Sequence, residues 1–307
     1  MNKTFLHKLG IYPIISLSMI FWGMSYVWST IVFKYYHPIT TIFFRLIISS
    51  FLLISFIFIT GKAEKIRKED RLLFLLSSLF NPFLYFLGEN FGLKYSTPTI
   101  SSVIIATIPV FITIVGYFFL KEKLSLLNIA GITVSFLGIG IMLVNPDFSL
   151  NSPLEGVLFL SGAVLAAVIY TIFLKRLAFK YSALTIITYQ NMIGVVYFLP
   201  LFIFVDYSHF ITVRPNFELI SSLIQLSLFA SSLAYIFYTM TIKELGVSRA
   251  SVFTNLIPVV TAIFSVIFIS EKFTATKIAG MATALIGVII AQAKNIHYNL
   301  KSTNSHN

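Results

Sequence analysis

The sequence predicts an all-α membrane protein of ten transmembrane helices, arranged as two inverted five-helix repeats. Three observations indicate this fold: a composition that is 57% hydrophobic and only 11% charged, ten apolar segments of membrane-spanning length, and a stretch of sequence that occurs twice. An ordinary soluble domain carries roughly a quarter charged residues. This chain is therefore expected to lie within a lipid bilayer.

The ten apolar segments define the expected elements. An α-helix needs about 20 apolar residues to cross the hydrocarbon core of a bilayer. Such segments lie near residues 11–32, 38–60, 72–92, 98–120, 125–145, 154–174, 182–204, 218–240, 248–270 and 274–293. The first is too long for the apolar region of a signal peptide and lacks a clear cleavage site. The gaps between segments are too short for a separate soluble domain.

The basic residues predict the orientation. Cytoplasmic loops of membrane proteins carry an excess of Lys and Arg. With the N-terminus in the cytoplasm, sixteen of the 22 basic residues fall on the inner side and five on the outer side, and Arg45 lies within a span. Ten spans then place both termini in the cytoplasm, including a polar tail at 294–307. This bias also accounts for the net charge of +11 without a nucleic-acid partner.

A repeated stretch divides the chain into halves. A shift of 149 residues aligns Ser102–Gly138 with Ser251–Gly287, and thirteen of these 37 positions are identical. We therefore predict one repeat at 11–145 and a second at 154–293. Because each repeat has five spans, the second begins on the opposite side of the membrane. Inverted repeats of this kind are a transporter architecture.

The repeated residues have expected structural roles. A proline within a helix removes one backbone hydrogen bond and kinks the helix. Glycines seven residues apart on one face allow two helices to approach closely. A carboxylate just before a helix favours its positive end. The residues concerned are Pro109 and Pro258, Gly131 and Gly280 (with Gly138 and Gly287), and Glu122 and Glu271.

Arg45 and Glu89 are the charged residues that stand out within the predicted spans. A charge at bilayer depth costs a few kcal/mol and needs a reason. The two lie at comparable heights, so one hypothesis is an ion pair between them. The other is that Glu89 binds a proton or a cation along a substrate path. Arg45 alone could instead recognise a carboxylate through its planar fork.

Further polar and aromatic residues are candidates for substrate or ion binding. Asn81, Tyr85 and Glu89 are spaced four apart and form one polar stripe on an apolar helix. Tyr26 and Tyr170 occupy related positions in the two halves and could stack on a substrate or a cation. Packing between helices is the alternative role for all of them. The remaining candidates are Trp22, Gln190, Tyr235, Tyr238 and Asn255.

The sequence offers little for enzyme chemistry. It has no cysteine, and its five histidines lie in termini or loops, so we expect neither a metal site nor a cofactor. Motifs of metalloproteases, serine hydrolases and nucleotide-binding loops are absent. Any transport would therefore be secondary or facilitative. A membrane-embedded sensor or scaffold without transport is the alternative.

Several motifs together resemble a known family. They are FWGMSYV at 21–27, FFRL around Arg45, GLKYSTPTISS at 92–102, and the paired Pro, Glu-Lys and Gly signatures of the repeat. The chain resembles the EamA-type transporters of the drug/metabolite transporter superfamily over residues 11–293. Pro98 departs from the family pattern, and the second half matches the 92–102 motif only loosely at 245–251.

The resemblance implies a ten-helix carrier of a small metabolite in the plasma membrane, the inner membrane of a bacterium. Such carriers commonly export amino acids or related compounds along a path between the two halves. Carriers of the same fold also move drugs or other metabolites. The resemblance does not specify the substrate or the oligomeric state.

Overall fold

The chain folds as a bundle of helices. The computed structural model describes residues 3–120, 125–144 and 152–304, and no β-strand occurs in them. Ten of the helical segments described are long and apolar enough to cross a membrane. The predicted all-α fold with ten spans is thus confirmed, with boundaries that shift by a few residues.

The first half contains spans one to five. Its elements are α1 (Lys3–Val32), α2 (Pro38–Thr60), η1 (Lys68–Asp70), α3 (Arg71–Ser78), η2 (Leu79–Leu84), α4 (Tyr85–Lys94), α5 (Pro98–Ile105), α6 (Ile108–Leu120) and α7 (Leu126–Leu143). The third span runs from η1 to α4, and the fourth joins α5 to α6.

The second half contains spans six to ten. Its elements are α8 (Leu154–Ala178), α9 (Ala183–Leu201), η3 (Phe202–Asp206), α10 (Tyr207–Phe210), α11 (Phe217–Gln225), η4 (Leu226–Leu233), α12 (Ala234–Leu245), α13 (Val247–Val252), η5 (Phe253–Asn255), α14 (Leu256–Ile269) and α15 (Ala275–Asn304). Since α15 continues to Asn304, most of the predicted polar tail is helical.

Local sequence signals set where the helices begin. The side chain of Thr97 accepts a hydrogen bond from the N–H of Ile100 at the start of α5. Ser125 and Asn128 form a reciprocal capping box at the start of α7. Both arrangements satisfy backbone N–H groups that have no partner within the helix. Gly61 ends α2 in the left-handed conformation, at φ +64°, which glycine adopts without steric cost.

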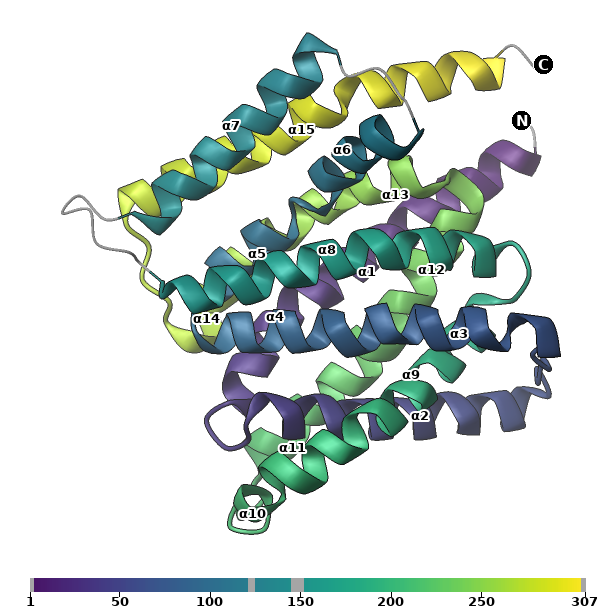
Figure 1. Ribbon diagram of the computed structural model, residues 1–307, viewed down its shortest axis with the longest axis vertical. Coiled ribbons are helices and arrows are strands. Elements are labelled where there is room, and N and C mark those ends of the chain that lie inside the picture. The colour runs from purple at the N-terminus through teal and green to yellow at the C-terminus, as the bar shows by residue number, and fades with distance from the viewer. Residues whose placement is uncertain (1–2, 121–124, 145–151, 305–307) are drawn as a thin grey trace.

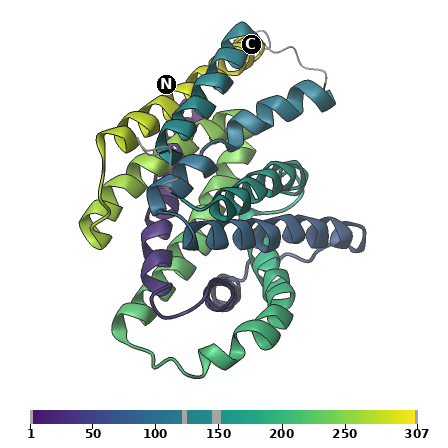
Figure 2. The same cartoon turned by 60° about the vertical axis from the view of Figure 1, so that its left-hand side comes forward.

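The two halves interlock. The main packing pairs each join a helix of one half to a helix of the other: α1 with α14 and α12, α2 with α9, α4 with α8, and α7 with α15. Figure 1 shows the helices lying side by side, with α7 and α15 along one edge and α2, α9 and α11 at the other. α1 begins and α15 ends at the same end of the bundle, as an even number of spans requires (Figures 1 and 2).

Glycines let α7 and α15 come into backbone contact. A Cβ atom added to Gly131 would lie 2.2 Å from the backbone nitrogen of Ala291, and one added to Gly138 would lie 2.2 Å from that of Ala284. On α15, a Cβ atom added to Gly287 would lie 2.2 Å from the backbone nitrogen of Ser135, and one added to Gly280 would lie 2.8 Å from that of Met142. The predicted close approach is therefore present. It suits a bilayer, where van der Waals packing rather than the hydrophobic effect drives helix association.

Several spans are interrupted within the bundle. Pro109 is the second residue of α6, after a break at residues 106–107, and Pro258 follows the short turn η5. The third and eighth spans widen into the π-helical segments η2 and η4, and within η2 Asn81 leaves helical geometry at φ −148°, ψ 118°. Such interruptions free backbone groups and redirect side chains.

Glu271 ties helix ends together. Its carboxylate accepts a hydrogen bond from Thr99 Oγ1 of α5 at 2.8 Å and forms a buried ion pair with Lys277 of α15. It does not contact a backbone N–H of α15, whose first turn receives a hydrogen bond to Thr274 Oγ1 instead. Its repeat counterpart, Glu122, lies outside the described residues.

Candidate functional site

A cavity lies where helices of the two halves meet. About 60 Å³ of it is open to the centre of a water molecule. α1, η2 and α4, the α5–α6 break, α8, α12 and the η5–α14 segment all contribute to its wall. Its lining residues are Trp22, Tyr26, Asn81, Tyr85, Glu89, Ile105, Ile108, Ala167, Tyr170, Thr171, Tyr235, Tyr238, Thr254 and Ile257.

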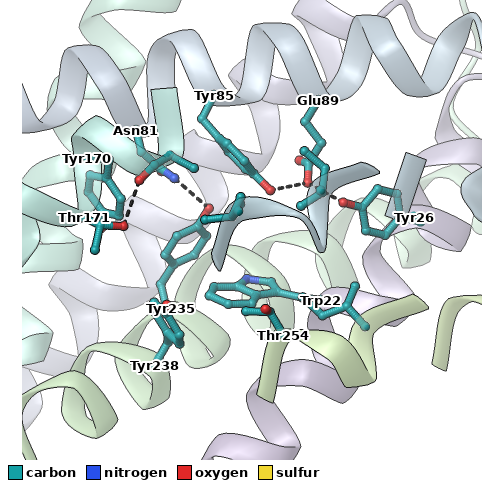
Figure 3. A pocket seen from close by; sticks show the side chains of 14 residues that line it. Trp22, Tyr26, Asn81, Tyr85, Glu89, Tyr170, Thr171, Tyr235, Tyr238 and Thr254 are labelled. Atoms are coloured by element: carbon teal, nitrogen blue, oxygen red, sulfur yellow. Dashed lines mark hydrogen bonds between the residues drawn. The ribbon is translucent and has the colours of Figure 1, made fainter. Parts of the chain in front are cut away.

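Glu89 projects from α4 into this cavity. Its Oε1 accepts a hydrogen bond from the Tyr85 hydroxyl at 2.8 Å and another from the Tyr26 hydroxyl at 3.2 Å. Figure 3 shows the carboxylate between these two phenols. Tyr85 lies one turn before Glu89 on the same helix, whereas Tyr26 comes from α1. Within the described chain, Oε2 accepts no hydrogen bond.

The break in η2 positions Asn81. Its non-helical backbone directs the side chain toward α12, where Nδ2 donates to the Tyr235 hydroxyl at 3.1 Å. The stripe of Asn81, Tyr85 and Glu89 that the sequence predicts thus lies along one wall of the cavity. A straight helix would present the same stripe, but the break brings Asn81 to the second half of the chain.

Aromatic rings form much of the remaining wall. The Trp22 ring lies 4.9 Å from that of Tyr235, edge to face at 71°, and 5.0 Å from that of Tyr238. Its indole N–H donates to the carbonyl of Ala230 at 3.3 Å. Ala230 belongs to the π-helical segment η4. This hydrogen bond therefore joins Trp22 of α1 to the eighth span.

Tyr170 lies on the opposite wall, on α8. Its hydroxyl donates to Gln190 Oε1 at 3.2 Å, and Gln190 Nε2 donates to Ser77 Oγ at 2.7 Å. Gln190 does not line the cavity itself but orients a tyrosine that does. Tyr26 and Tyr170, which the repeat relates, both reach the same cavity.

Arg45 lies outside the cavity lining. Its Nε donates to Ser231 Oγ at 2.8 Å, and its guanidinium carbon lies 4.2 Å from the centroid of the Phe86 ring. No ion pair joins it to Glu89 in the part of the chain that the structure describes, so the hypothesis of a direct pair is wrong. The side chains of the two residues contact different neighbours.

Asn255 also lies outside the lining. Its side chain is only 9% exposed, and neither polar atom of its amide has a hydrogen-bond partner among the described residues. The preceding residue, Thr254, faces the cavity instead. The helical turn η5 determines which of the two neighbours reaches the wall.

The lining includes residues that sequence reasoning did not select. They are Thr171, Thr254, Ala167 and three isoleucines, Ile105, Ile108 and Ile257. A single Thr or Ile in an apolar helix carries no distinctive signal. Ile108 and Ile257, however, open the two copies of the repeated Ile-Pro-Val stretch, and both line the cavity. That repeat was the available signal.

A protein-family comparison matches the chain twice, at residues 10–144 and 154–292, to the model described as the EamA-like transporter family. The chain belongs to the EamA-like transporter family. The family resemblance seen in the sequence is thereby confirmed. The EamA-like membership and the ten spans make this chain a multi-pass membrane protein of a transporter family rather than an enzyme.

Curated relatives of this EamA-like protein are also named as transporters. An uncharacterized transporter of Archaeoglobus fulgidus is 27% identical over 281 residues, which cover 92% of this chain and 98% of the relative. The uncharacterized transporter YetK of Bacillus subtilis is 25% identical, over 94% of this chain and 88% of its own.

A protein of known crystal structure shares the fold of this EamA-like chain. It superposes with a TM-score of 0.67 at 14% sequence identity, over 92% of this chain and 98% of the other. At this identity the likeness concerns the fold alone.

Metal-binding side chains do not gather in the described residues. Within 3–120, 125–144 and 152–304, no group of three or more His, Cys, Asp or Glu residues is placed to hold a metal ion. Glu89 is the carboxylate of the central cavity, and the groups around it are phenols, an amide and apolar side chains.

Proposed function

We propose that this chain is a secondary transporter that carries a small metabolite across the plasma membrane through the central cavity. The observation that carries the proposal is a cavity inside the bundle with one carboxylate and several phenols, built by helices of both halves. Polar groups at membrane depth are costly unless they pack between helices or line a path. Here they line an enclosed space.

The proposed mechanism is alternating access between two inverted repeats, one near 11–145 and the other near 154–293. The sequence repeat supports it, and so do matched interruptions: η2 corresponds to η4, and the break before Pro109 corresponds to η5 before Pro258. Repeats of this kind provide two near-equivalent packings, one open to each side. Interrupted helices supply the places where such packings differ.

Orientation and direction are part of the proposal. The excess of basic residues in alternate loops supports cytoplasmic termini. The family resemblance favours export, with amino acids or related compounds as the substrates that it commonly implies. No nucleotide-binding motif occurs in the sequence, so we propose an ion or substrate gradient as the energy source, with Glu89 as the site of an exchangeable proton or cation.

The remaining candidates take supporting roles in this proposal. Tyr26, Tyr85, Tyr170, Tyr235 and Tyr238 contact the substrate along with Trp22 and Asn81. Gln190 orients Tyr170. Arg45 holds α2 against the eighth span through Ser231 and does not bind substrate directly.

Counterflow in proteoliposomes tests the proposal. Liposomes containing purified protein are loaded with a broad panel of unlabelled metabolites, and uptake of labelled counterparts is followed. We expect saturable counterflow with at least one solute. Absence of flux with every solute class would contradict transport and favour a sensor or scaffold.

A cavity-filling variant links the flux to this site. Thr171 lines the cavity, and among the described residues its hydroxyl bonds to the Ala167 carbonyl of its own helix alone. Thr171→Phe should therefore abolish counterflow by occupying the cavity. Ile172→Phe is the matched control, because Ile172 is the next residue on α8 and is 49% exposed on the outside of the bundle. Flux that survived in the Thr171 variant would place the path elsewhere.

A further inference from the structure

We propose that the ligand of the central cavity is a small organic cation, whose charge lies at Glu89 and whose apolar body lies against aromatic rings. This inference rests on the proposed function for its physiological meaning, because it names the substrate class of the same site. It differs from the amino-acid expectation in a testable way, since an amino acid also brings a carboxylate.

The charge of the lining supports a cation. Glu89 is the only Asp, Glu, Lys, Arg or His among the residues that line the cavity. The nearby base, Arg45, is held outside the lining by Ser231 and the Phe86 ring. A ligand carboxylate would therefore enter without a basic partner and beside a like charge, which is unfavourable in a buried site.

One oxygen of Glu89 is left for a ligand. Both phenol hydroxyls, from Tyr26 and Tyr85, donate to Oε1. In the described chain no group of the protein donates to Oε2, and this oxygen is not among the fully buried polar atoms that lack a partner. It is therefore open to the cavity, where a ligand ammonium or alkylammonium group would supply a positively charged partner.

The aromatic lining supports an organic rather than a hydrated inorganic cation. Six aromatic side chains surround the space (Figure 3): Trp22, Tyr26, Tyr85, Tyr170, Tyr235 and Tyr238. Aromatic faces attract cations and also pack against alkyl groups, and cages of such rings recognise quaternary ammonium compounds. Tyr26 and Tyr85 donate hydrogen bonds to Glu89, Tyr170 donates to Gln190, and Tyr235 accepts from Asn81. Four of the five tyrosine rings are therefore held in place before a ligand arrives.

Binding can be read from Trp22. The chain has two tryptophans, and only Trp22 lines the cavity. In a Trp28→Phe background, the fluorescence of the detergent-solubilised protein therefore reports on the cavity alone. Trp28 packs against Phe229 at 5.9 Å between ring centroids, a contact that a phenylalanine retains in part.

Two sets of near-isosteric probes separate charge from shape. The quaternary set is choline, its neutral analogue 3,3-dimethylbutan-1-ol, the anion 3,3-dimethylbutanoate and the zwitterion glycine betaine. The primary set is 3-methylbutylamine, 3-methylbutan-1-ol, 4-methylpentanoate and leucine. We expect the cation of at least one set to bind about tenfold or more tightly than every other member of that set.

Variants of Glu89 test the origin of this preference. Glu89→Gln should remove the preference for the cation, whereas Glu89→Asp should keep part of it. A partial preference in the Asp variant would show that misfolding does not explain the loss in the Gln variant. Glu155→Gln, an acid on α8 away from the cavity, should leave it unchanged. The proposal is overturned if no probe binds, if a neutral, anionic or zwitterionic member equals or exceeds the cation in both sets, or if Glu89→Gln keeps the full preference.

The binding test and the transport test fail independently. Binding is measured without a membrane gradient or flux. Counterflow of some solute without a preference for cations in binding would support the transporter proposal and contradict the proposal of a cationic ligand. A clear preference for cations in binding, with no flux of any solute, would support a cationic ligand and contradict transport.

Discussion

Glu89 is the residue at which we propose that a proton or cation exchanges. It is buried at membrane depth, where a charge costs a few kcal/mol, and its neighbours can stabilise or replace that charge. The groups that face it are Tyr26 of α1, Tyr85 of its own helix, Tyr235 of α12 and, at longer range, Arg45 of α2. None of the three phenols is a base at neutral pH.

Replacing Glu89 should therefore uncouple transport from protons. We expect Glu89→Gln proteoliposomes to show no acceleration of uptake when a pH gradient is imposed, because the amide cannot take up or release a proton. Glu155→Gln should respond to the gradient like the unmodified protein. Gradient dependence that persisted in the Glu89 variant would assign this residue a structural role.

Glu271 provides a second prediction, for stability. It lies in the loop between α14 and α15, outside the spans. Burial opposes its ionised form, but the hydrogen bond and charge of Lys277 outweigh burial and hold its pKa below the ordinary value of 4.5. A carboxylate whose pKa is depressed by folding stabilises the fold at any pH above its pKa in the unfolded chain. This contribution is lost as the pH falls through its pKa in the folded protein.

The Glu271→Gln variant should lack this pH response. At neutral pH we expect a loss of stability of order 3 kcal/mol, because Lys277 stays buried without its partner. As the pH falls below about 4.5 and then through the lower pKa of Glu271 in the folded protein, the melting temperatures of the variant and the unmodified protein should converge. Glu69→Gln is the control, since Glu69 and its partner Arg67 are both about 70% exposed. Equal melting temperatures at neutral pH would refute the structural role of Glu271.

Individual side chains were predictable only in part. The stripe of Asn81, Tyr85 and Glu89 follows from helical spacing, so its members share a wall of the cavity. Equal depth suggested a pair between Arg45 and Glu89, but depth does not specify how each helix is rotated about its axis. Arg45 faces Ser231 and Phe86, and that choice depends on packing between spans that are far apart in the sequence.

Among the elements, α7 and α15 depend most directly on small residues. A methyl group at Gly131 would overlap the backbone of α15. We expect Gly131→Ala to force the helices apart at a cost of about 1–3 kcal/mol and to lower the melting temperature in detergent. Gly140→Ala lies on the same helix, and an added Cβ atom there meets nothing within 4 Å.

This pair of variants isolates close packing from helix propensity. Alanine favours a helix over glycine by about 1 kcal/mol, so Gly140→Ala should leave the melting temperature unchanged or raise it. If Gly131→Ala behaved in the same way, the two helices would not be in backbone contact in the membrane.

The elements themselves differed in how well the sequence predicted them. Hydropathy located all ten spans, because the thickness of the bilayer sets the length of an apolar helix. Pro109 and Pro258 marked two of the interruptions. The π-helical segments η2 and η4 had no comparable signal, since their side chains and carbonyl groups contact helices that are distant in the sequence, as the hydrogen bond from the Trp22 indole to the carbonyl of Ala230 shows.

At the scale of the whole molecule, the repeat carries the functional argument. Shared residues at an offset of 149 predicted two related halves, and both copies of the Ile-Pro-Val isoleucine, Ile108 and Ile257, reach the central cavity. The sequence could not show that the aromatic residues of α1, α4, α8 and α12 would converge there. That convergence depends on packing between the halves, which no local pattern encodes.

Transport by alternating access requires the cavity to open to each side of the membrane in turn. The chain has no cysteine, so a single one at position 238, introduced as Tyr238→Cys, can be labelled selectively. A membrane-impermeant thiol reagent is added to sealed vesicles of either orientation. We expect the cysteine to be labelled from both faces. Labelling from one face only, or from neither, would contradict it.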